Sequence, residues 1–199
     1  MRISYINTKT TVISQVELDA QFACCDKIAA YWQIKGRTPT AYVETYGCQQ
    51  NEADSEKLRG FLAQCGYAIV GSAEGADVGI MNTCAIREHA EQRVFGNVGA
   101  LVHVKRRHPE QLICLCGCMV QQPQVADKIR APYRHVDLVF GPPALWKFPE
   151  MIHTLLLHRG PIFQHADAAG PTADGLPVAA PAHRQPSRPT TSGCHPLGH

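Results

Sequence analysis

The sequence repeats one local pattern three times, and each repeat places a cysteine where a strand gives way to a helix. A run of strand-forming residues is followed by a polar or glycine break, then by Cys48, Cys84 or Cys118, and then by a helical pattern. Successive cysteines are about one βα unit apart. Because the carboxyl ends of parallel strands lie along one edge of an open sheet, where ligands bind, we expect these three thiols to converge there.

The same alternation of strands and helices extends over most of the chain. Strands are predicted over residues 41–46, 67–70, 77–82, 112–116 and 136–140, and helices over 54–65, 88–107, 125–130 and 141–158. Strands that alternate with longer helices predict a parallel sheet covered on both faces. We therefore predict a Rossmann-like or flavodoxin-like three-layer α/β domain over residues 40–160, with a parallel sheet of about five strands.

Two flanking segments lie outside this predicted domain. Residues 1–39 form an N-terminal extension in which a loosely amphipathic pattern predicts a helix from about 15 to 35, ended by Gly36 and Pro39. From position 164 onward the sequence has no isoleucine, methionine, phenylalanine, tyrosine or tryptophan, and it is rich in proline. Such a composition buries too little apolar surface to offset chain entropy, so we predict a disordered tail over residues 161–199.

Composition narrows the class of protein. Of the 199 residues, 45% are hydrophobic and 18% are charged, and the net charge of +2 indicates no large nucleic-acid-binding surface. No apolar run is long enough to span a bilayer and the N-terminus lacks a signal-peptide pattern, so we expect a cytoplasmic protein without a membrane partner. In that compartment the nine cysteines are expected to be metal ligands, catalysts or core residues rather than disulfides.

Three cysteines at one sheet edge suit an iron–sulfur cluster. Four cysteine thiolates usually hold such a cluster, so three leave one iron open to water, substrate or an external sulfur ligand. The helices that follow stabilise thiolate charge at their N-termini, and Gly47 and Gly117 allow the backbone to approach a bulky cluster closely. Two alternatives stay open: three ordinary buried cysteines, or a zinc site, which usually has four ligands in close pairs.

The remaining cysteines and charged residues indicate no second site. Cys114 and Cys116 alternate along a predicted strand and are expected in the core. The adjacent Cys24 and Cys25 are either a thiol pair or, more usually, packing residues. No G-x-G-x-x-G or P-loop motif supports dinucleotide or ATP binding, and the basic run 105–108 is interpreted as a solvated helix end.

Three short motifs surround the strand-exit cysteines. They are Tyr46-Gly-Cys-Gln-Gln-Asn51, Asn82-Thr-Cys-Ala-Ile-Arg87 and Gly117-Cys-Met-Val-Gln121. Together with residues 136–142, they resemble the N-terminal domain of the methylthiotransferase family, most closely its tRNA branch, which converts N6-isopentenyladenosine next to the anticodon to its 2-methylthio form. The resemblance covers residues 40–160. It implies that Cys48, Cys84 and Cys118 bind one auxiliary 4Fe–4S cluster that supplies or carries the inserted sulfur.

The chain departs from this family after position 178. Family members continue into a radical-SAM domain, whose C-x-x-x-C-x-x-C motif holds a second 4Fe–4S cluster that acts on S-adenosyl-L-methionine, and then into a small RNA-binding domain. Neither is present in these 199 residues. A shifted reading frame and a genuine short paralogue would both give this pattern, and both interpretations stay open.

The favoured interpretation is the cluster-binding N-terminal part of a tRNA methylthiotransferase, inactive as this chain alone. We assign no catalytic residue, expect weak or absent tRNA binding, and consider a radical-SAM domain in trans as a partner. The main alternative is a stand-alone iron–sulfur carrier or scaffold without catalytic activity. A third is a flavodoxin-like binding module with coincidental cysteines.

Overall fold

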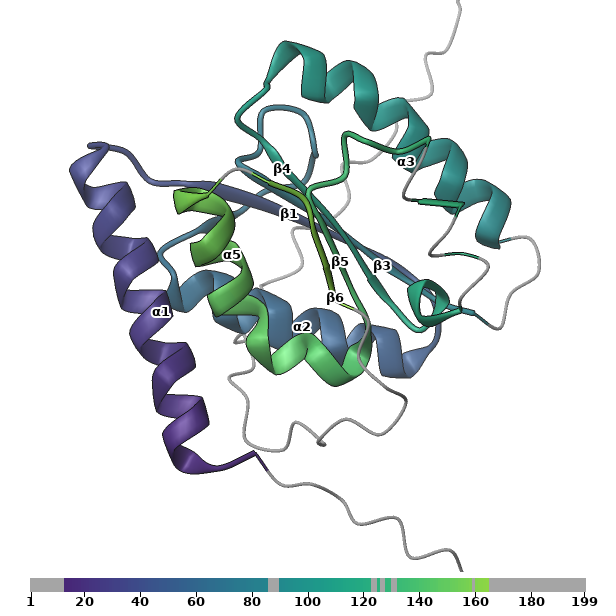
Figure 1. Cartoon of the computed structure of the whole chain (residues 1–199). Helices are drawn as coiled ribbons and strands as arrows, with labels where there is room; N and C mark the ends of the chain where they lie inside the picture. Colours follow the sequence, from purple (N-terminus) through teal and green to yellow (C-terminus); the bar gives the residue numbers. More distant parts are fainter. Residues whose placement is uncertain are drawn as a thin grey trace, which may run out of the picture.

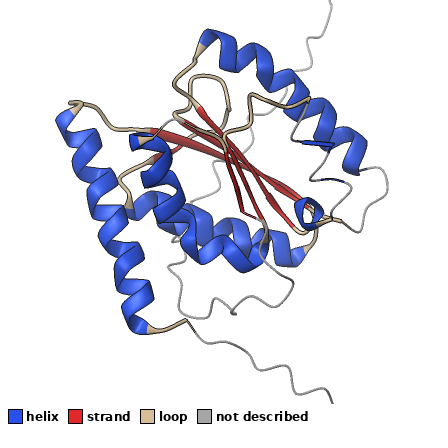
Figure 2. Cartoon of the chain, in the orientation of Figure 1, coloured by secondary structure: helices blue, strands red, loops and turns tan. Residues whose placement is uncertain are grey.

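In the part of the chain that the structure describes, six strands form one parallel sheet with helices on both faces (Figures 1 and 2). The structure is a computed structural model, and it describes residues 13–85, 90–122, 125, 128–129, 132–158 and 160–164. The strands are β1 (Thr40–Tyr46), β2 (Ala68–Ile69), β3 (Val78–Thr83), β4 (Leu112–Gly117), β5 (Leu138–Phe140) and β6 (Ile162–Gln164). The helices are α1 (Gln15–Ile34), α2 (Gln49–Gln64), α3 (Ala90–Arg107) and α5 (Phe148–Leu157), with 3₁₀ turns at Met119–Gln121 and Pro142–Lys147.

The strand order confirms the predicted fold class. It is β2-β1-β3-β4-β5-β6, and every neighbouring pair is parallel. The first five strands have the order of flavodoxin-like folds, in which the strand order reverses between β1 and β3. Ligands of such folds bind outside the carboxyl ends of these two strands, so the topology alone directs attention to the residues that follow β1 and β3.

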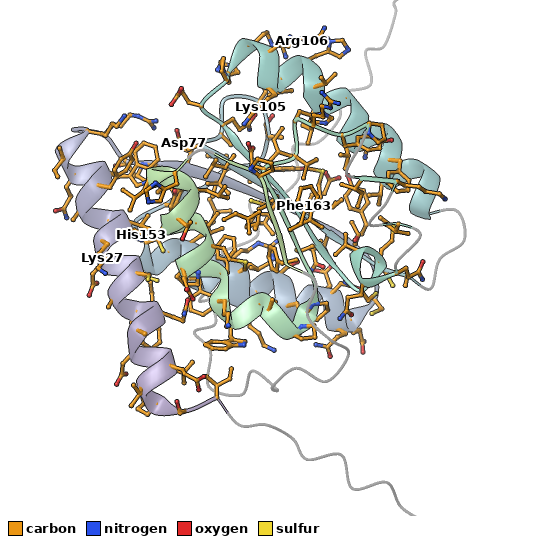
Figure 3. All side chains as sticks on the ribbon, viewed as in Figure 1. Lys27, Asp77, Lys105, Arg106, His153 and Phe163 are labelled. Carbon is orange, nitrogen blue, oxygen red and sulfur yellow. The ribbon has the colours of Figure 1, made fainter. Side chains whose placement is uncertain are left out.

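The sheet has one strand more than the five predicted. Residues 162–164, which we assigned to the disordered tail, form β6 at the sheet edge next to β5. The Ile162 amide donates to the Asp137 carbonyl oxygen at 2.8 Å, and the Phe163 side chain is partly buried against the core (Figure 3). Three residues are too few to show a strand period, so this segment acquires its structure from pairing with β5.

Two apolar cores lie on opposite faces of the sheet. Alternate residues along each strand point to opposite faces, so Cys114 and Cys116 of β4 belong to one core while Ile113 and Leu115 belong to the other. Helices α1, α2 and α5 cover the first face, and α3 covers the second (Figure 1). These are the three layers predicted from the sequence.

The predicted N-terminal helix is present and packs into the first core. α1 begins with a capping box, in which the Glu17 amide donates to Ser14 Oγ at 3.3 Å and the Ser14 amide donates to the Glu17 carboxylate at 2.9 Å. Its buried face includes Cys25, Ile28 and Trp32. The extension is therefore tied to the α/β domain by apolar contacts along α1.

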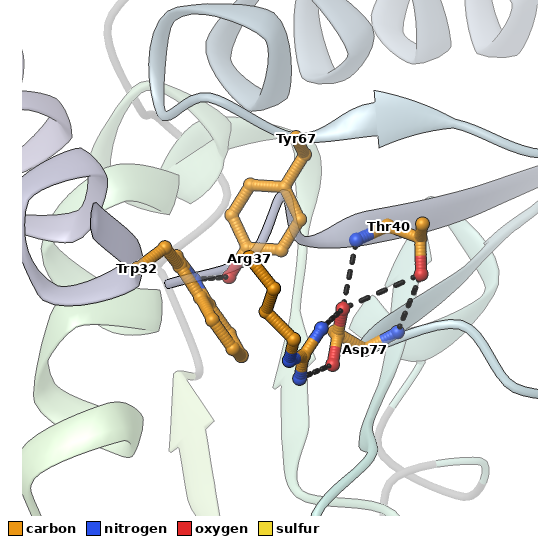
Figure 4. Close-up of polar contacts among 5 residues, drawn as sticks. All are labelled: Trp32, Arg37, Thr40, Tyr67 and Asp77. Carbon is orange, nitrogen blue, oxygen red and sulfur yellow. Dashed lines mark hydrogen bonds and ion pairs between the residues drawn. The ribbon is translucent and has the colours of Figure 1, made fainter. Parts of the chain in front are cut away.

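A polar network lies at the amino-terminal ends of the strands, which form the amino edge of the sheet, opposite the strand-exit cysteines (Figure 4). The Asp77 carboxylate accepts from both terminal nitrogens of Arg37, at 2.7 and 2.5 Å, and from the Thr40 amide at 2.8 Å. The Arg37 guanidinium also lies over the Trp32 ring, 4.4 Å from its centroid, and Trp32 Nε1 donates to the Tyr67 hydroxyl at 3.0 Å. This network joins the end of α1 to the starts of β1 and β3.

Several predictions fall wholly or partly on residues that the structure does not describe. Half of the helix expected over 125–130 lies outside the described residues, as do the first two residues of the helix expected over 88–107. The segment 165–199 of the predicted disordered tail also lies outside them. In the part of the chain that the structure describes, no helix has the length and apolar character needed to cross a membrane.

Candidate metal centre

The three strand-exit cysteines follow three adjacent strands. Cys48 comes after β1 and immediately precedes α2, Cys84 comes directly after β3, and Cys118 comes directly after β4. The last residues of these strands are paired with one another in register. The structure therefore brings the three thiols to one edge of the sheet, as their spacing predicts, and places two of them at the β1/β3 position where this fold binds ligands.

Cys84 is the central thiol of the three. It follows β3, the strand between β1 and β4, and its side chain lies close enough to Cys48 and Cys118 to affect the pKa of both thiols. Cys84 is only 2% exposed, whereas Cys48 and Cys118 are half-buried. The Ala85 amide donates to Cys118 Sγ at 2.9 Å, so the backbone that follows Cys84 also fixes the third thiol. The three thiols thus lie next to one another along the rim of the sheet, in the order of the strands β1, β3 and β4 that they follow.

The donor set fits an iron–sulfur cluster better than a single metal ion. Within the described residues, no three histidine, cysteine or acidic side chains are arranged around one ion. In a 4Fe–4S cluster each thiolate binds a different iron, so the ligands stand further apart than around one ion. Three separate thiols along one rim, rather than three donors around one point, are the arrangement that such a cluster requires.

The start of α2 favours a negative charge on Cys48. Backbone amides of Asn51 and Gln50 point at its sulfur and lower the pKa of this thiol. The physical cause is the set of unpaired N–H groups in the first turn of a helix, together with the positive end of the helix dipole. Burial instead raises the pKa of Cys118, against the opposing effect of the Ala85 amide. Cys48 is thus better prepared than Cys118 to act as a thiolate ligand.

Each half-buried cysteine follows a glycine that the packing requires. Gly117 has φ +102°, and a Cβ there would collide with the carbonyl oxygen of Thr83 and lie 2.6 Å from the Thr83 nitrogen. A Cβ on Gly47 would lie 2.6 Å from Cγ of Asn51. The role proposed for these glycines from the sequence was close approach of the backbone to a cluster. In the structure they first allow close approach of neighbouring protein atoms.

A buried polar network beneath the cysteines was not anticipated. Asn51 Nδ2 donates to Asn82 Oδ1 at 3.0 Å and to the Thr83 carbonyl oxygen at 3.1 Å. Asn82 Nδ2 donates in turn to the Asn51 carbonyl oxygen at 2.8 Å and to Ser55 Oγ at 3.0 Å. The network locks the first turn of α2 to the end of β3, and so sets Cys48 relative to Cys84. Its signal in the sequence was the presence of both asparagines inside the cysteine motifs.

Cys114 and Cys116 lie in the interior, as their alternation along β4 predicted. Both are at most 2% exposed, and burial raises the pKa of each thiol. A buried thiol that keeps its proton is a poor metal ligand, because the thiolate is the form that binds metal. These two cysteines therefore serve as internal controls for the three at the rim.

Comparison with known proteins places the cysteine motifs in a recurring domain. A family model described as "Uncharacterized protein family UPF0004" matches residues 40–141, which include Cys48, Cys84 and Cys118. A relative from Alkaliphilus oremlandii (strain OhILAs) is 40% identical over 167 residues, which is 84% of this chain and 35% of the relative. A relative from Clostridioides difficile (strain 630) is 41% identical over 146 residues, which is 73% of this chain and 30% of the relative. Both relatives are named tRNA-2-methylthio-N(6)-dimethylallyladenosine synthase, and this chain spans about a third of their length.

Proposed function

Since this chain belongs to the UPF0004 family, we propose that it is the cluster-binding N-terminal part of a tRNA methylthiotransferase. The complete enzyme would convert N6-isopentenyladenosine, next to the anticodon, to 2-methylthio-N6-isopentenyladenosine in cytoplasmic tRNA. The names of the relatives support this substrate. S-adenosyl-L-methionine and the second 4Fe–4S cluster would belong to the part of the enzyme that the matched third does not include.

The observation that carries the proposal is the convergence of Cys48, Cys84 and Cys118 on one edge of the sheet. We propose that these residues hold one auxiliary 4Fe–4S cluster, which when bound would carry or supply the sulfur. The protein's own contribution begins with Cys48, whose thiolate the amides at the start of α2 stabilise. The Ala85 amide would offer the same kind of hydrogen bond to a Cys118 thiolate.

The test is iron binding by matched cysteine variants of the full chain. Cys48→Ala, Cys84→Ala and Cys118→Ala are each reconstituted anaerobically with iron and sulfide, and bound iron and visible charge-transfer absorbance are measured. We expect each variant to lose the cluster, because two thiolates cannot replace three. Cys116→Ala is the control, since this buried thiol lies two residues from Cys118 and points into the core.

Circular dichroism separates loss of ligand from loss of fold. A folded Cys118→Ala variant that holds as much iron as the parent chain would refute the ligand assignment. Equal loss of iron from Cys116→Ala and Cys118→Ala, with both folded, would also refute it, because the core thiol would then matter as much as the proposed ligand.

A further inference from the structure

Two buried thiols meet where α1 packs against the end of α2, far from the candidate metal centre. Cys25 on the inner face of α1 is 2% exposed, and Cys65, which follows the last residue of α2, is 1% exposed. The Cys25 side chain lies close enough to Cys65 to raise the pKa of the Cys65 thiol. They come from different elements, so the contact is created by the packing of the helices and not by the local sequence. Figure 1 shows the two helices meeting there.

The backbones approach closely at the same place. Ala29 lies one helical turn after Cys25, and Gly66 directly follows Cys65. A Cβ on Gly66 would stand 3.8 Å from the Cβ of Ala29, which is ordinary van der Waals contact. A disulfide needs its two Cα atoms within about 7 Å, so a close crossing of two backbones is the geometry that accommodates one.

A pocket beside Cys65 gives small molecules a path to this thiol. It has a volume of about 390 Å³, and its lining includes Cys65, Gly66 and Ala29 together with Trp32 and Arg37. Cys65 is therefore buried from bulk solvent but forms part of the wall of an open pocket. A small thiol reagent that enters the pocket meets Cys65 before it meets Cys25.

We propose that Cys25 and Cys65 form a redox-sensitive pair, and that its oxidation by a small disulfide covalently fastens α1 to α2. The Cys65 thiolate attacks one sulfur of the small disulfide, forms a mixed disulfide and expels one small thiolate. The Cys25 thiolate then attacks Cys65 Sγ, forms the Cys25–Cys65 bond, breaks the bond between Cys65 and the small-molecule sulfur, and expels the second small thiolate. The protein thereby gives up two electrons, the small disulfide is reduced to two thiols, and the two protein protons end on those thiols.

The resting form of the pair is the dithiol. The nearby Cys25 side chain and burial both raise the pKa of Cys65, so this thiol keeps its proton at neutral pH. Because only the thiolate attacks a disulfide, the exchange at Cys65 is slow at neutral pH and becomes faster as pH rises, and the pair oxidises only where oxidised small disulfides accumulate. This behaviour is typical of cytosolic disulfides, which are usually transient and responsive to redox conditions.

The proposed bond would connect a segment outside the matched family domain to one inside it. Cys65 lies within residues 40–141, whereas Cys25 lies before them. The pair is near the amino edge of the sheet, since Cys65 precedes β2, whose residues pair with the start of β1. The length of β1 separates it from the candidate metal centre. The proposal is therefore independent of the proposed cluster and can be tested without iron.

The experiment exposes the folded full chain, free of iron, to 2-hydroxyethyl disulfide. Remaining thiols are then blocked with N-ethylmaleimide, and tryptic peptides are analysed without reduction. We expect a link between peptide 10–27 and peptide 60–87, and tandem mass spectrometry to place it at Cys25 and Cys65. We also expect the oxidised chain to melt roughly 5–10 °C above the reduced chain, because the bond closes a loop of about 40 residues.

Cys24→Ala is the matched control, because Cys24 neighbours Cys25 in α1 and is half-buried. This variant should form the same link and show the same rise in melting temperature, whereas Cys25→Ala should show neither. A link that forms through Cys24, or no link in the folded parent chain, would overturn the proposal. A linked chain that melts no higher than the reduced one would also overturn it, since the native packing would then not accommodate the bond.

Discussion

Replacing Gly117 by alanine tests whether the backbone beside Cys118 is as constrained as the structure indicates. Gly117 ends β4 with φ +102°, a conformation that residues with a Cβ rarely adopt. The added Cβ would collide with the Thr83 carbonyl oxygen and lie 2.6 Å from Asn82 Oδ1. Thr83 ends β3, which is paired with β4, so relief of the collision requires two paired strands to separate locally.

The expected loss of stability has two parts. A positive φ costs a residue with a Cβ about 1–2 kcal/mol. Overpacking against atoms that cannot move freely costs about 1–3 kcal/mol more. We therefore expect Gly117→Ala to lower the free energy of unfolding by about 2–5 kcal/mol, a large part of the stability of an ordinary domain. Urea denaturation followed by circular dichroism, with the parent chain alongside, measures this difference.

Gly36→Ala supplies the control, because it isolates the conformational part. Gly36 has φ +69°, and a Cβ there would meet no atom within 4 Å. Its expected cost is about 1–2 kcal/mol, the conformational part alone. If Gly117→Ala destabilises the chain no more than Gly36→Ala does, the inference that β3 approaches Gly117 too closely to admit a Cβ is wrong.

Three further predictions address the amino edge, the activity of the chain and its C-terminal segment. Burial raises the pKa of Asp77, but the hydrogen bonds from Arg37 and Thr40 lower it by more. The net result is a pKa of Asp77 below its usual range. Asp77→Asn should therefore lower the free energy of unfolding by about 1–2 kcal/mol at pH 7. This difference should shrink as pH falls below about 4, because Asp77 becomes protonated as the pH passes through its lowered pKa. A difference in urea stability that stays constant down to low pH would refute this. The 199-residue chain alone should not methylthiolate isopentenylated tRNA, because it contains no C-x-x-x-C-x-x-C motif; 2-methylthio nucleoside above a no-protein control, detected after RNA digestion, would contradict this. Limited proteolysis should cut first within residues 165–199, where large apolar side chains are scarce, and leave a product that ends soon after Gln164; a protease-resistant C-terminal segment would count against that interpretation.

The parallel sheet and the place of the three thiols were predictable because both follow from short-range patterns. Alternation of strand and helix patterns requires crossover connections, and crossovers make neighbouring strands parallel. Once the strands are parallel, a cysteine that follows a strand lies at the carboxyl edge whatever the strand order. This is why Cys48, Cys84 and Cys118 could be assigned to one edge without knowledge of the tertiary structure.

The sixth strand and the buried asparagines were not predictable in this way. Ile162 and Phe163 show no strand period, and their segment becomes a strand through a hydrogen bond to Asp137 and contact with core residues. Asn51 and Asn82 are polar residues that local patterns assign to the surface, and they are buried because each satisfies the other's hydrogen bonds.

The sequence by itself determined the fold class, the edge at which the three strand-exit cysteines lie and the alternation that buries Cys114 and Cys116. Only the tertiary structure decided that Cys84 stands between Cys48 and Cys118, and that Cys25 meets Cys65. The physical reason is that periodicity and turn residues act over a few positions and fix which way a side chain points. Which two side chains meet depends on strand order and on how the helices cross, and these follow from burial of apolar surface over the whole chain.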